Sequence, residues 1–264
     1  MENNKTKTAL VTGAASGLGF ELALLLAKDN YNLILIDIDA ERLDEAERNI
    51  LKDYQTNITL MVKDLSLENI AQDIYANLNN AKIDVIINNA GFGMFGNFCD
   101  SDWERDSQML NLHILTTTHL LKLLLPDMVK RGSVKILNLS SLAAFQPGPL
   151  MALYYASKGY ILSFSEAISN ELKGTGVTVT ALCPGPTKTS FQSVVSEDAA
   201  ENKIAFNMAC PKEVARYGYN AMLKGKVVAI PGTINKFLSV LARILTRNRT
   251  RKIVRKIQDK NRAS

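Results

Sequence analysis

Tyr154 and Lys158 are the two residues of this sequence whose types and spacing best suit acid–base chemistry. They lie four positions apart in a stretch with a helical pattern, so both side chains point from one face of a helix. A nearby cation favours the ionised form of a phenol. A tyrosine that exchanges protons near neutral pH needs its pKa to fall from about 10 to about 7, and the lysine is one source of that fall. The other interpretation is a packed tyrosine beside a solvated lysine.

A predicted strand and a short loop position this pair. The apolar run at 134–140 indicates a buried strand that leads to Ser140 and Ser141. A loop rich in proline and glycine then opens a helix predicted over 150–173. Either serine hydroxyl can therefore lie near the tyrosine.

A second group of residues is suited to binding phosphates. A short apolar strand ends at a loop with three glycines, Gly13, Gly17 and Gly19, and a helical pattern follows. Glycines let the backbone approach a pyrophosphate, and the helix N-terminus offers free N–H groups and the positive end of a dipole. The next apolar strand ends at Asp37, whose carboxylate can accept hydrogen bonds from an adenosine ribose. This unit predicts a dinucleotide site.

Strands and helices alternate along the chain, and the apolar runs are continuous, as in strands buried on both faces of a parallel sheet. We predict strands at 8–12, 33–36, 58–62, 83–88, 134–140, 177–182 and 227–230, and helices at 20–29, 41–54, 67–79, 102–130, 150–173 and 212–223. This order indicates an α/β fold, a single-domain Rossmann-type doubly wound parallel sheet of about seven strands with helices on both faces. We expect residues 1–235 to form the catalytic domain and 236–264 a basic amphipathic helical extension.

The composition narrows the class of protein. The chain has 264 residues, of which 47% are hydrophobic and 22% charged, which fits one globular domain. We expect neither a signal peptide nor a membrane span, because the first residues are polar and no run of about 18 apolar residues occurs. Cys99, Cys183 and Cys210 show no metal or redox spacing, so the sequence predicts no metal site and a cytoplasmic location.

Several motifs, taken in order, resemble those of the short-chain dehydrogenase/reductase superfamily over about residues 7–232. They are Thr12-Gly13-x-x-x-Gly17-x-Gly19, Asp64, Asn88-Asn89-Ala90-Gly91, the set Asn111, Ser141, Tyr154 and Lys158, which matches the family's catalytic tetrad, and Pro184-Gly185. The stretches 146–149 and 183–187 further resemble the DltE-like subgroup, whose members have varied substrates.

The resemblance implies an NAD(P)-dependent oxidoreductase that interconverts a carbonyl and a secondary alcohol by hydride transfer. Tyr154 would exchange the hydroxyl proton, Lys158 would lower its pKa and bond the nicotinamide ribose, and Ser141 would donate to the substrate oxygen. Asn111 would hold a water near the lysine. Ser140 competes for the serine role, but Ser141 lies thirteen residues before the tyrosine, the family's usual separation. The implied cofactor-binding residues are Thr12, Gly13, Ser16, Gly17, Leu18, Gly19, Asp37, Asp64, Leu65, Asn88, Ala90, Gly91, Tyr154, Lys158, Pro184, Gly185, Thr187 and Thr189.

The stretch around Asp37 bears on the choice of cofactor. The subgroup often has an arginine just after the second strand, whereas this chain has Asp37-Ile38-Asp39, and Ser16 is not basic either. A carboxylate repels a 2′-phosphate and accepts from a 2′-hydroxyl, so the sequence favours NAD(H) over NADP(H).

Residues 188–210 are expected to cover the substrate. Together with apolar residues from other loops they predict a pocket for an apolar ketone or alcohol, although each of these side chains could equally be part of the core. The set comprises Phe92, Met94, Phe95, Leu142, Phe145, Leu150, Phe191, Val194, Val195, Ile204, Phe206 and Met208.

The C-terminal stretch differs in charge from the rest. Residues 236–262 contain ten Lys or Arg and one Asp, a net charge of +9, whereas the remainder holds 21 basic and 25 acidic residues, a net −4. An apolar helical stripe runs through 237–245. Three interpretations compete: packing on the body or on another subunit of a homodimer or homotetramer, contact with an anionic membrane surface, and nucleic-acid binding, which the sequence disfavours because no aromatic stacking set accompanies the charges. For the whole chain, the rival to an enzyme is a catalytically silent dinucleotide-binding regulator or scaffold.

Overall fold

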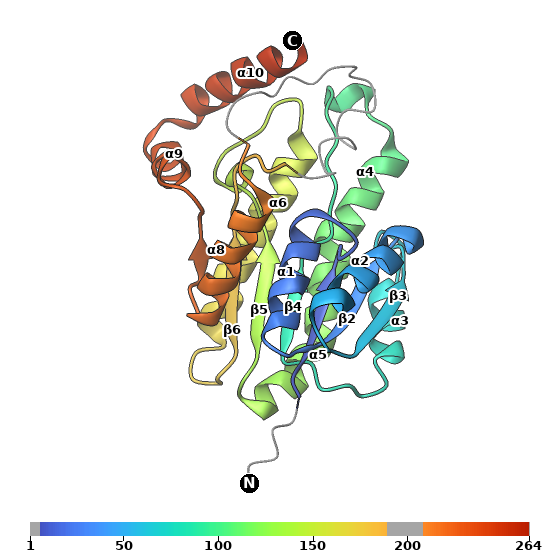
Figure 1. Cartoon of the computed structure of the whole chain (residues 1–264). Helices are drawn as coiled ribbons and strands as arrows, with labels where there is room; N and C mark the ends of the chain where they lie inside the picture. Colours follow the sequence, from blue (N-terminus) through green and yellow to red (C-terminus); the bar gives the residue numbers. More distant parts are fainter. Residues whose placement is uncertain (1–5, 189–207, 264) are drawn as a thin grey trace.

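The computed structural model describes residues 6–188 and 208–263 (Figure 1). It has a seven-stranded, wholly parallel sheet with the strand order β3-β2-β1-β4-β5-β6-β7. The strands are β1 (Thr8–Thr12), β2 (Asn32–Asp37), β3 (Ile58–Val62), β4 (Val85–Asn88), β5 (Lys135–Leu139), β6 (Thr178–Leu182) and β7 (Val228–Ala229). The predicted doubly wound fold is confirmed, and each predicted strand lies within a few residues of its place.

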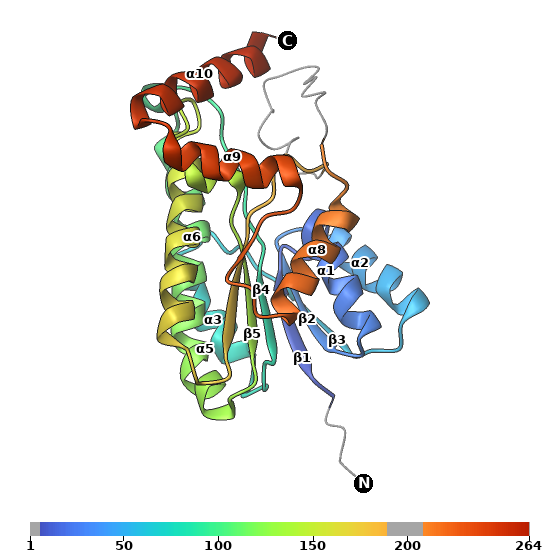
Figure 2. The same ribbon diagram turned by 90° about the vertical axis from the view of Figure 1, so that its left-hand side faces the viewer.

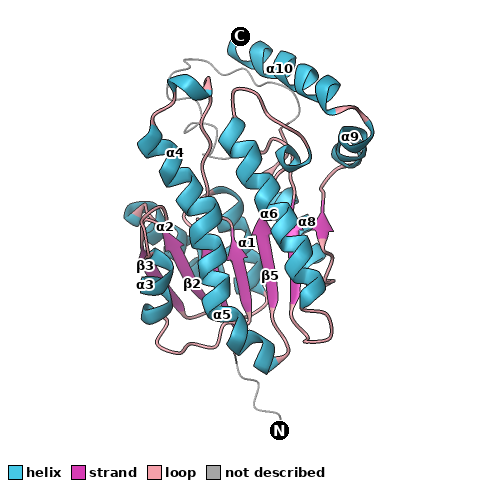
Figure 3. Ribbon diagram, turned by 180° about the vertical axis from the view of Figure 1, so that it is seen from behind, coloured by secondary structure: helices cyan, strands magenta, loops and turns pink. Residues whose placement is uncertain are grey.

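Helices cover both faces of the sheet (Figures 2 and 3). One layer contains α1 (Gly17–Lys28), α2 (Ala40–Asp53) and α8 (Pro211–Leu223), and the other α3 (Ile70–Asn77), α5 (Thr117–Arg131) and α6 (Ala152–Glu171). The elements beyond the sheet are α4 (Trp103–Leu110), the short 3₁₀ helices η1 (Phe98–Asp100) and η3 (Leu142–Phe145), and the C-terminal helices α9 (Thr233–Ile244) and α10 (Arg247–Ala263).

The two helical layers explain why the strands are apolar without alternation. Successive side chains of a strand point to opposite faces of the sheet. In β1, Ala9 and Val11 pack in the core under α1 and α8, whereas Leu10 packs in the core under α3 and α5. Both faces are therefore dry, and a run of apolar residues is the pattern that this sheet needs.

The predicted continuous helix over 102–130 is wrong in its middle. Asn111–Thr116 forms a π-helical segment, η2, between α4 and α5. The Thr116 hydroxyl donates to the carbonyl oxygen of Leu65 at 2.9 Å, which ties this segment to the loop after β3. Such π segments insert an extra residue into a helix and are frequent at functional sites. Helical periodicity alone does not reveal the insertion, because the apolar spacing on either side of it is that of an ordinary helix.

The C-terminal helices α9 and α10 lie at the end of the molecule where the strands finish (Figure 1). α9 packs against η3, and Gln258 of α10 reaches the start of α6. Across the part of the chain that the structure describes, no helix is both long enough and apolar enough to cross a bilayer.

Candidate active site

The predicted site residues gather at one edge of the sheet. Parallel strands all finish at the same edge, and in open α/β sheets ligands bind beyond it. Gly13 follows β1, Asp37 ends β2, Asn88 ends β4, Ser141 lies just after β5 and Pro184 just after β6. Residues far apart in the sequence are thereby brought to one place.

The loop after β1 is held by Asn89, a residue that the set of predicted ligands omits. The Asn89 side-chain amide donates to the carbonyl oxygens of Thr12 and Gly13, each at 3.0 Å. In return, the Thr12 hydroxyl accepts from the backbone N–H groups of Asn89 and Ala90 at 3.0 and 3.1 Å. The doubled asparagine at the end of β4 is the sequence signal that could have revealed this contact.

The glycines of this loop are there because no side chain fits. A Cβ on Gly19 would lie 1.9 Å from the carbonyl oxygen of Gly13, and one on Gly13 would lie 2.9 Å from the Cα of Ala90. Gly13 also has a φ of +64°, in the region that glycine adopts most readily. The backbone of α1 and that of the loop therefore lie in direct contact.

The start of α1 fits a phosphate group. Ser16 is the N-cap, yet its side chain makes no capping hydrogen bond, and the first turn holds no acidic residue. Its N–H groups and dipole are therefore available to an anion. Leu18, by contrast, is buried in the core, so only its backbone can serve a ligand.

Asp37 stabilises the same loop through its carboxylate. One oxygen accepts from the N–H of Ala15 at 3.0 Å, and the other from the N–H groups of Ile38 and Asp39 at 2.8 and 3.2 Å. The remaining lone pairs of this half-buried carboxylate are those that would face a ribose. The groups present thus fit an adenosine dinucleotide.

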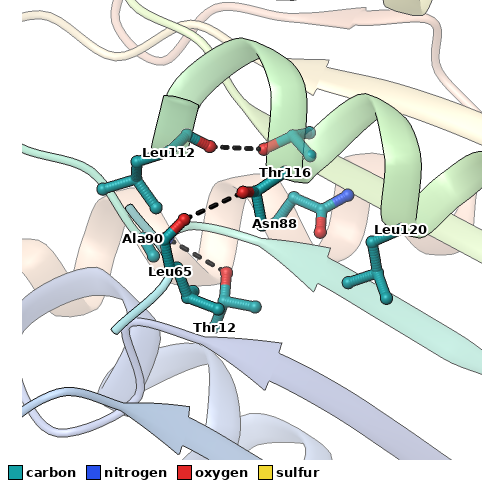
Figure 4. Close-up of a pocket in the computed structure, with 8 residues that line it drawn as sticks. Thr12, Leu65, Asn88, Ala90, Leu112, Thr116 and Leu120 are labelled. Carbon is teal, nitrogen blue, oxygen red and sulfur yellow. Dashed lines mark hydrogen bonds between the residues drawn. The ribbon is translucent and has the colours of Figure 1, made fainter. Parts of the chain in front are cut away.

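The ends of β1 and β4 and the loop after β3 border a small cavity of about 10 Å³, drawn in Figure 4. A volume of this size is room for about one water molecule. Its lining consists of Thr12, Leu65, Asn88, Ala90, Leu112, Thr116, Thr117 and Leu120. The junction between the glycine loop after β1 and the π-helical segment is thus closely packed.

Two predicted cofactor residues near this cavity are engaged within the protein. The Asn88 amide donates to the Asn138 side-chain oxygen at 2.8 Å, in a buried position. Asp64 accepts from the backbone N–H and the hydroxyl of Ser66 at 2.9 and 2.7 Å, which fixes the turn after β3. Both lie at the expected edge, and their contacts to a cofactor stay a prediction.

Half-buried Tyr154 and buried Lys158 lie together near the start of α6. The Lys158 ammonium is 5.8 Å from the centre of the Tyr154 ring and donates to the carbonyl oxygen of Leu139 at 3.0 Å. The Tyr154 side chain hydrogen-bonds with that of Ser141. The Ser140 hydroxyl instead donates to the carbonyl oxygen of Lys158 at 2.8 Å, so of the two serines it is Ser141 whose hydroxyl meets the phenol.

Burial is the largest influence on the pKa of Tyr154 in the protein without a cofactor. Burial raises the pKa of Tyr154 to about 12, and the hydrogen bond with Ser141 lowers it in part. Burial likewise lowers the pKa of Lys158 to about 8. The expected lowering of the tyrosine pKa by Lys158 is therefore not seen, and desolvation of the phenolate is the largest influence on that pKa. The phenol is therefore protonated at neutral pH.

His113 is a site residue that the sequence reasoning missed. It lies in η2, is only 2% exposed, and its Nδ1 is 2.8 Å from the Ser157 hydroxyl. That hydroxyl donates its proton to the carbonyl oxygen of Tyr154, so Nδ1 must be the donor to it. Burial and the charge of Lys158 keep the pKa of His113 well below its ordinary value, so the ring is neutral.

The position of the His113 ring also explains why residue 91 is a glycine. A Cβ on Gly91 would lie 2.6 Å from His113 Nε2 and 3.5 Å from Lys158 Nζ. The histidine thus links the π-helical segment, the loop after β4 and the backbone of Tyr154. One of only two histidines in the chain, placed two residues after Asn111, was the available signal.

The remaining predicted residues surround this centre. Asn111 is the first residue of η2. The carbonyl of Pro184 accepts from the N–H of Leu142 at 2.8 Å, Gly185 packs on Asn235 of α9, and the Thr187 hydroxyl donates to the Gly185 carbonyl at 3.0 Å. Outside the described residues lie Thr189 and part of the predicted apolar set, namely Phe191, Val194, Val195, Ile204 and Phe206.

Replacing Lys158 with methionine should stabilise the fold while removing its charge. Below pH 8 the folded protein carries a buried ammonium whose pKa is about 8 instead of 10.5. The unfolded chain binds more protons than the folded one between these values, so the stability of the parent rises with pH there. We expect Lys158→Met to gain about 2 kcal/mol at pH 7, after the loss of one hydrogen bond, and to lose that advantage toward pH 10.5. Urea unfolding from pH 7 to 10 measures it, with the exposed Lys122→Met as control. A pH-independent difference would contradict the burial argument.

Comparison with known proteins agrees with this fold. A family model for short chain dehydrogenases matches residues 7–200. Ketoacyl reductase HetN of Nostoc sp. is 32% identical over 226 residues, which cover 83% of this chain and 74% of that protein. The very-long-chain 3-oxoacyl-CoA reductase of Anas platyrhynchos is 32% identical over 214 residues, 79% of this chain and 66% of that protein. A solved short-chain dehydrogenase from Sphingobium yanoikuyae in complex with NADPH superposes with a TM-score of 0.80 at 25% identity, covering 86% of this chain and 88% of that one.

A parallel α/β sheet with a glycine loop after its first strand, and a tyrosine beside a buried lysine at the same edge, defines a class of nicotinamide-dependent oxidoreductases. The match over 7–200 makes the assignment specific: the chain belongs to the short-chain dehydrogenase family, whose members act on carbonyl and alcohol groups.

Proposed function

We propose that this protein reduces the carbonyl group of an apolar ketone to a secondary alcohol, with Tyr154 as the proton donor. The observation that carries the proposal is the hydrogen bond between Ser141 and Tyr154, next to the buried Lys158 and at the sheet edge that holds the glycine loop. A nicotinamide dinucleotide bound along that loop would supply the hydride.

Each residue has a separate task in this proposal. The phenol of Tyr154 passes its proton to the carbonyl oxygen as that oxygen gains negative charge. The Ser141 hydroxyl donates to the same oxygen and holds it beside the phenol. Lys158 supplies a positive charge near the phenolate that remains, and Asn111 would hold a water through which the proton is replaced. His113 keeps the backbone of Tyr154 in place through Ser157.

The apolar residues near the site support an apolar substrate. Met94 and Phe95 after β4 and Leu142 at the start of η3 are half-buried, whereas Leu150 is buried and Phe92 packs against the core. Two of the relatives are named for reducing ketoacyl or 3-oxoacyl compounds. The stretches 146–149 and 183–187 support membership of the DltE-like subgroup in this proposal. The three free cysteines support a cytoplasmic location. We also propose that the protein forms a homodimer or homotetramer.

A spectrophotometric assay tests this function. The protein is mixed with NADH or NADPH and with ketones of increasing chain length or ring size, including 3-ketoacyl thioesters, and absorbance in the nicotinamide band is followed. We expect turnover to rise with the apolar size of the ketone. Dinucleotide binding without turnover of any ketone or alcohol would instead favour the silent regulator.

NAD(H) is the cofactor that Asp37 favours in this proposal. A hydrogen bond to a charged group contributes about 1.5–3 kcal/mol, so Asp37→Asn should raise the KM for NADH by about tenfold or more and narrow its advantage over NADPH. Asp39→Asn removes the same charge two residues away and keeps an N-cap for α2. This substitution should change little in the KM for NADH or in the KM for NADPH. Equal effects of the two substitutions would mean that the general charge, not a contact of Asp37, sets the preference.

A further inference from the structure

Helix α9 is attached with its apolar side outward. Among its described residues Ser239 alone is fully buried, at 5% exposure, whereas Phe237 is 66% and Ile244 76% exposed. Ile234, Phe237, Leu241 and Ile244 are spaced by three, four and three residues and so form one stripe along the helix. Surface helices of globular proteins ordinarily turn such a stripe to the core.

Specific contacts hold α9 in this orientation. Lys236 places its ammonium 5.8 Å from the centre of the Tyr217 ring, and the Arg243 guanidinium lies 5.5 Å from that of Phe145. Cations over aromatic faces are attractive contacts. The polar side of α9 is therefore the side that the body binds, and the exposed stripe follows from that geometry.

The next helix, α10, is also anchored by a polar contact. Its Gln258 amide donates to the Tyr155 hydroxyl at 3.0 Å. Val254, one helical turn before Gln258, is also buried. Ile253 and Ile257 are about half exposed. The helix also exposes a set of basic side chains, Arg249, Arg251, Lys252 and Lys256.

Charge decides which partner fits this surface. The segment 236–262 has a net charge of +9. A second copy of the chain, joined stripe to stripe, would bring two such segments together, and like charges in an interface disfavour association. A bilayer with anionic lipids offers both a negative surface and an apolar interior, which suits an amphipathic helix followed by basic residues.

We propose that the exposed stripe of α9 and the basic side chains of α10 form a peripheral binding surface for an anionic lipid membrane. The surface adjoins the substrate side of the site, because Arg243 covers Phe145 of η3 and Gln258 binds the residue next to Tyr154. Binding would seat the site at the lipid surface. Resting on the proposed function, this assigns the substrate to carbonyl or alcohol compounds with a long apolar chain that partition into membranes.

Vesicle flotation tests the surface with the full-length protein. The probes are phosphatidylcholine vesicles with and without phosphatidylglycerol, at low and high salt. We expect binding to the anionic vesicles only, weakened by salt, and reduced about tenfold or more in the double variant Phe237→Ser and Ile244→Ser. The charge variant Arg249→Gln, Lys252→Gln and Lys256→Gln should also bind more weakly.

A matched control separates the stripe from exposed apolar side chains in general. Leu51 and Tyr75 are also exposed, on α2 and α3, so Leu51→Ser with Tyr75→Ser should retain vesicle binding. Absence of vesicle binding by the parent protein, or unchanged binding in the stripe variant, would overturn the proposal. A dimer that the stripe variant converts to monomer, without vesicle binding by either, would identify a second copy as the partner. Vesicle binding needs no turnover, so its outcome is independent of the proposed reaction.

Discussion

Tyr154→Phe should lower kcat for ketone reduction by about 10²–10⁴-fold, the usual contribution of a positioned acid or base, and leave the Kd for the dinucleotide nearly unchanged. The substitution removes the phenol oxygen and keeps the ring, which packs at 6.1 Å, centre to centre, against both His113 and Tyr155. Steady-state kinetics and a cofactor titration measure the two effects. Retained turnover would refute the proposed role of the tyrosine.

The neighbouring tyrosine supplies a matched control. Tyr155 lies on the same helix, and its hydroxyl is bound by Gln258 of α10 instead of facing Ser141. Tyr155→Phe should therefore keep kcat within about twofold, because only general acid–base groups contribute the larger factor.

A pKa of about 12 for Tyr154 means that the phenol is protonated at neutral pH, so ketone reduction should run at that pH. Alcohol oxidation, in contrast, should accelerate as the pH rises.

Gly19→Ala should abolish measurable dinucleotide binding and also destabilise the fold. The new Cβ would lie 1.9 Å from the carbonyl oxygen and 2.7 Å from the carbonyl carbon of Gly13, and backbone cannot move aside as a flexible side chain can. Forcing extra atoms into a close-packed place costs about 1–3 kcal/mol or more. The shift would also break the two hydrogen bonds from Asn89 that hold the loop.

Thermal unfolding and a fluorescence titration with NADH measure both consequences. Gly159→Ala is the control, since a Cβ there has its nearest neighbour, the carbonyl oxygen of Ala144, at 3.6 Å. Gly159 lies inside α6, where alanine is favoured over glycine by about 0.5–1 kcal/mol, so this variant should be as stable as the parent or more so. A Gly19→Ala protein with the parent's melting temperature and Kd would show that the loop is not constrained as its backbone contacts indicate.

The sequence by itself determined the local features of this protein. Glycines at fixed spacing, a carboxylate at the end of the second strand and a tyrosine one helical turn from a lysine are short-range patterns, and each depends on residues a few positions apart. Continuous apolar strands predicted a sheet covered on both faces, and the seven parallel strands confirm it.

Other features depend on contacts between distant parts of the chain. No local periodicity in the sequence predicts the order of the strands or the π-helical turn at Asn111. The same holds for the contact of His113 with Ser157, which lies forty-four residues later. Between the two serines, the sequence offered only the thirteen-residue separation of Ser141 from Tyr154, whereas the structure shows that the Ser140 hydroxyl donates to the Lys158 carbonyl.

Burial and orientation were decided by the tertiary structure alone. The spacing of Tyr154 and Lys158 indicated attraction between charge and phenol, but desolvation is set by everything packed around them, and it raises the tyrosine pKa instead. An apolar helical stripe over 237–245 was visible in the sequence, whereas the side of the helix that faces the body was not. Cation–π contacts to Tyr217 and Phe145, residues that the sequence places far from α9, turn that stripe outward.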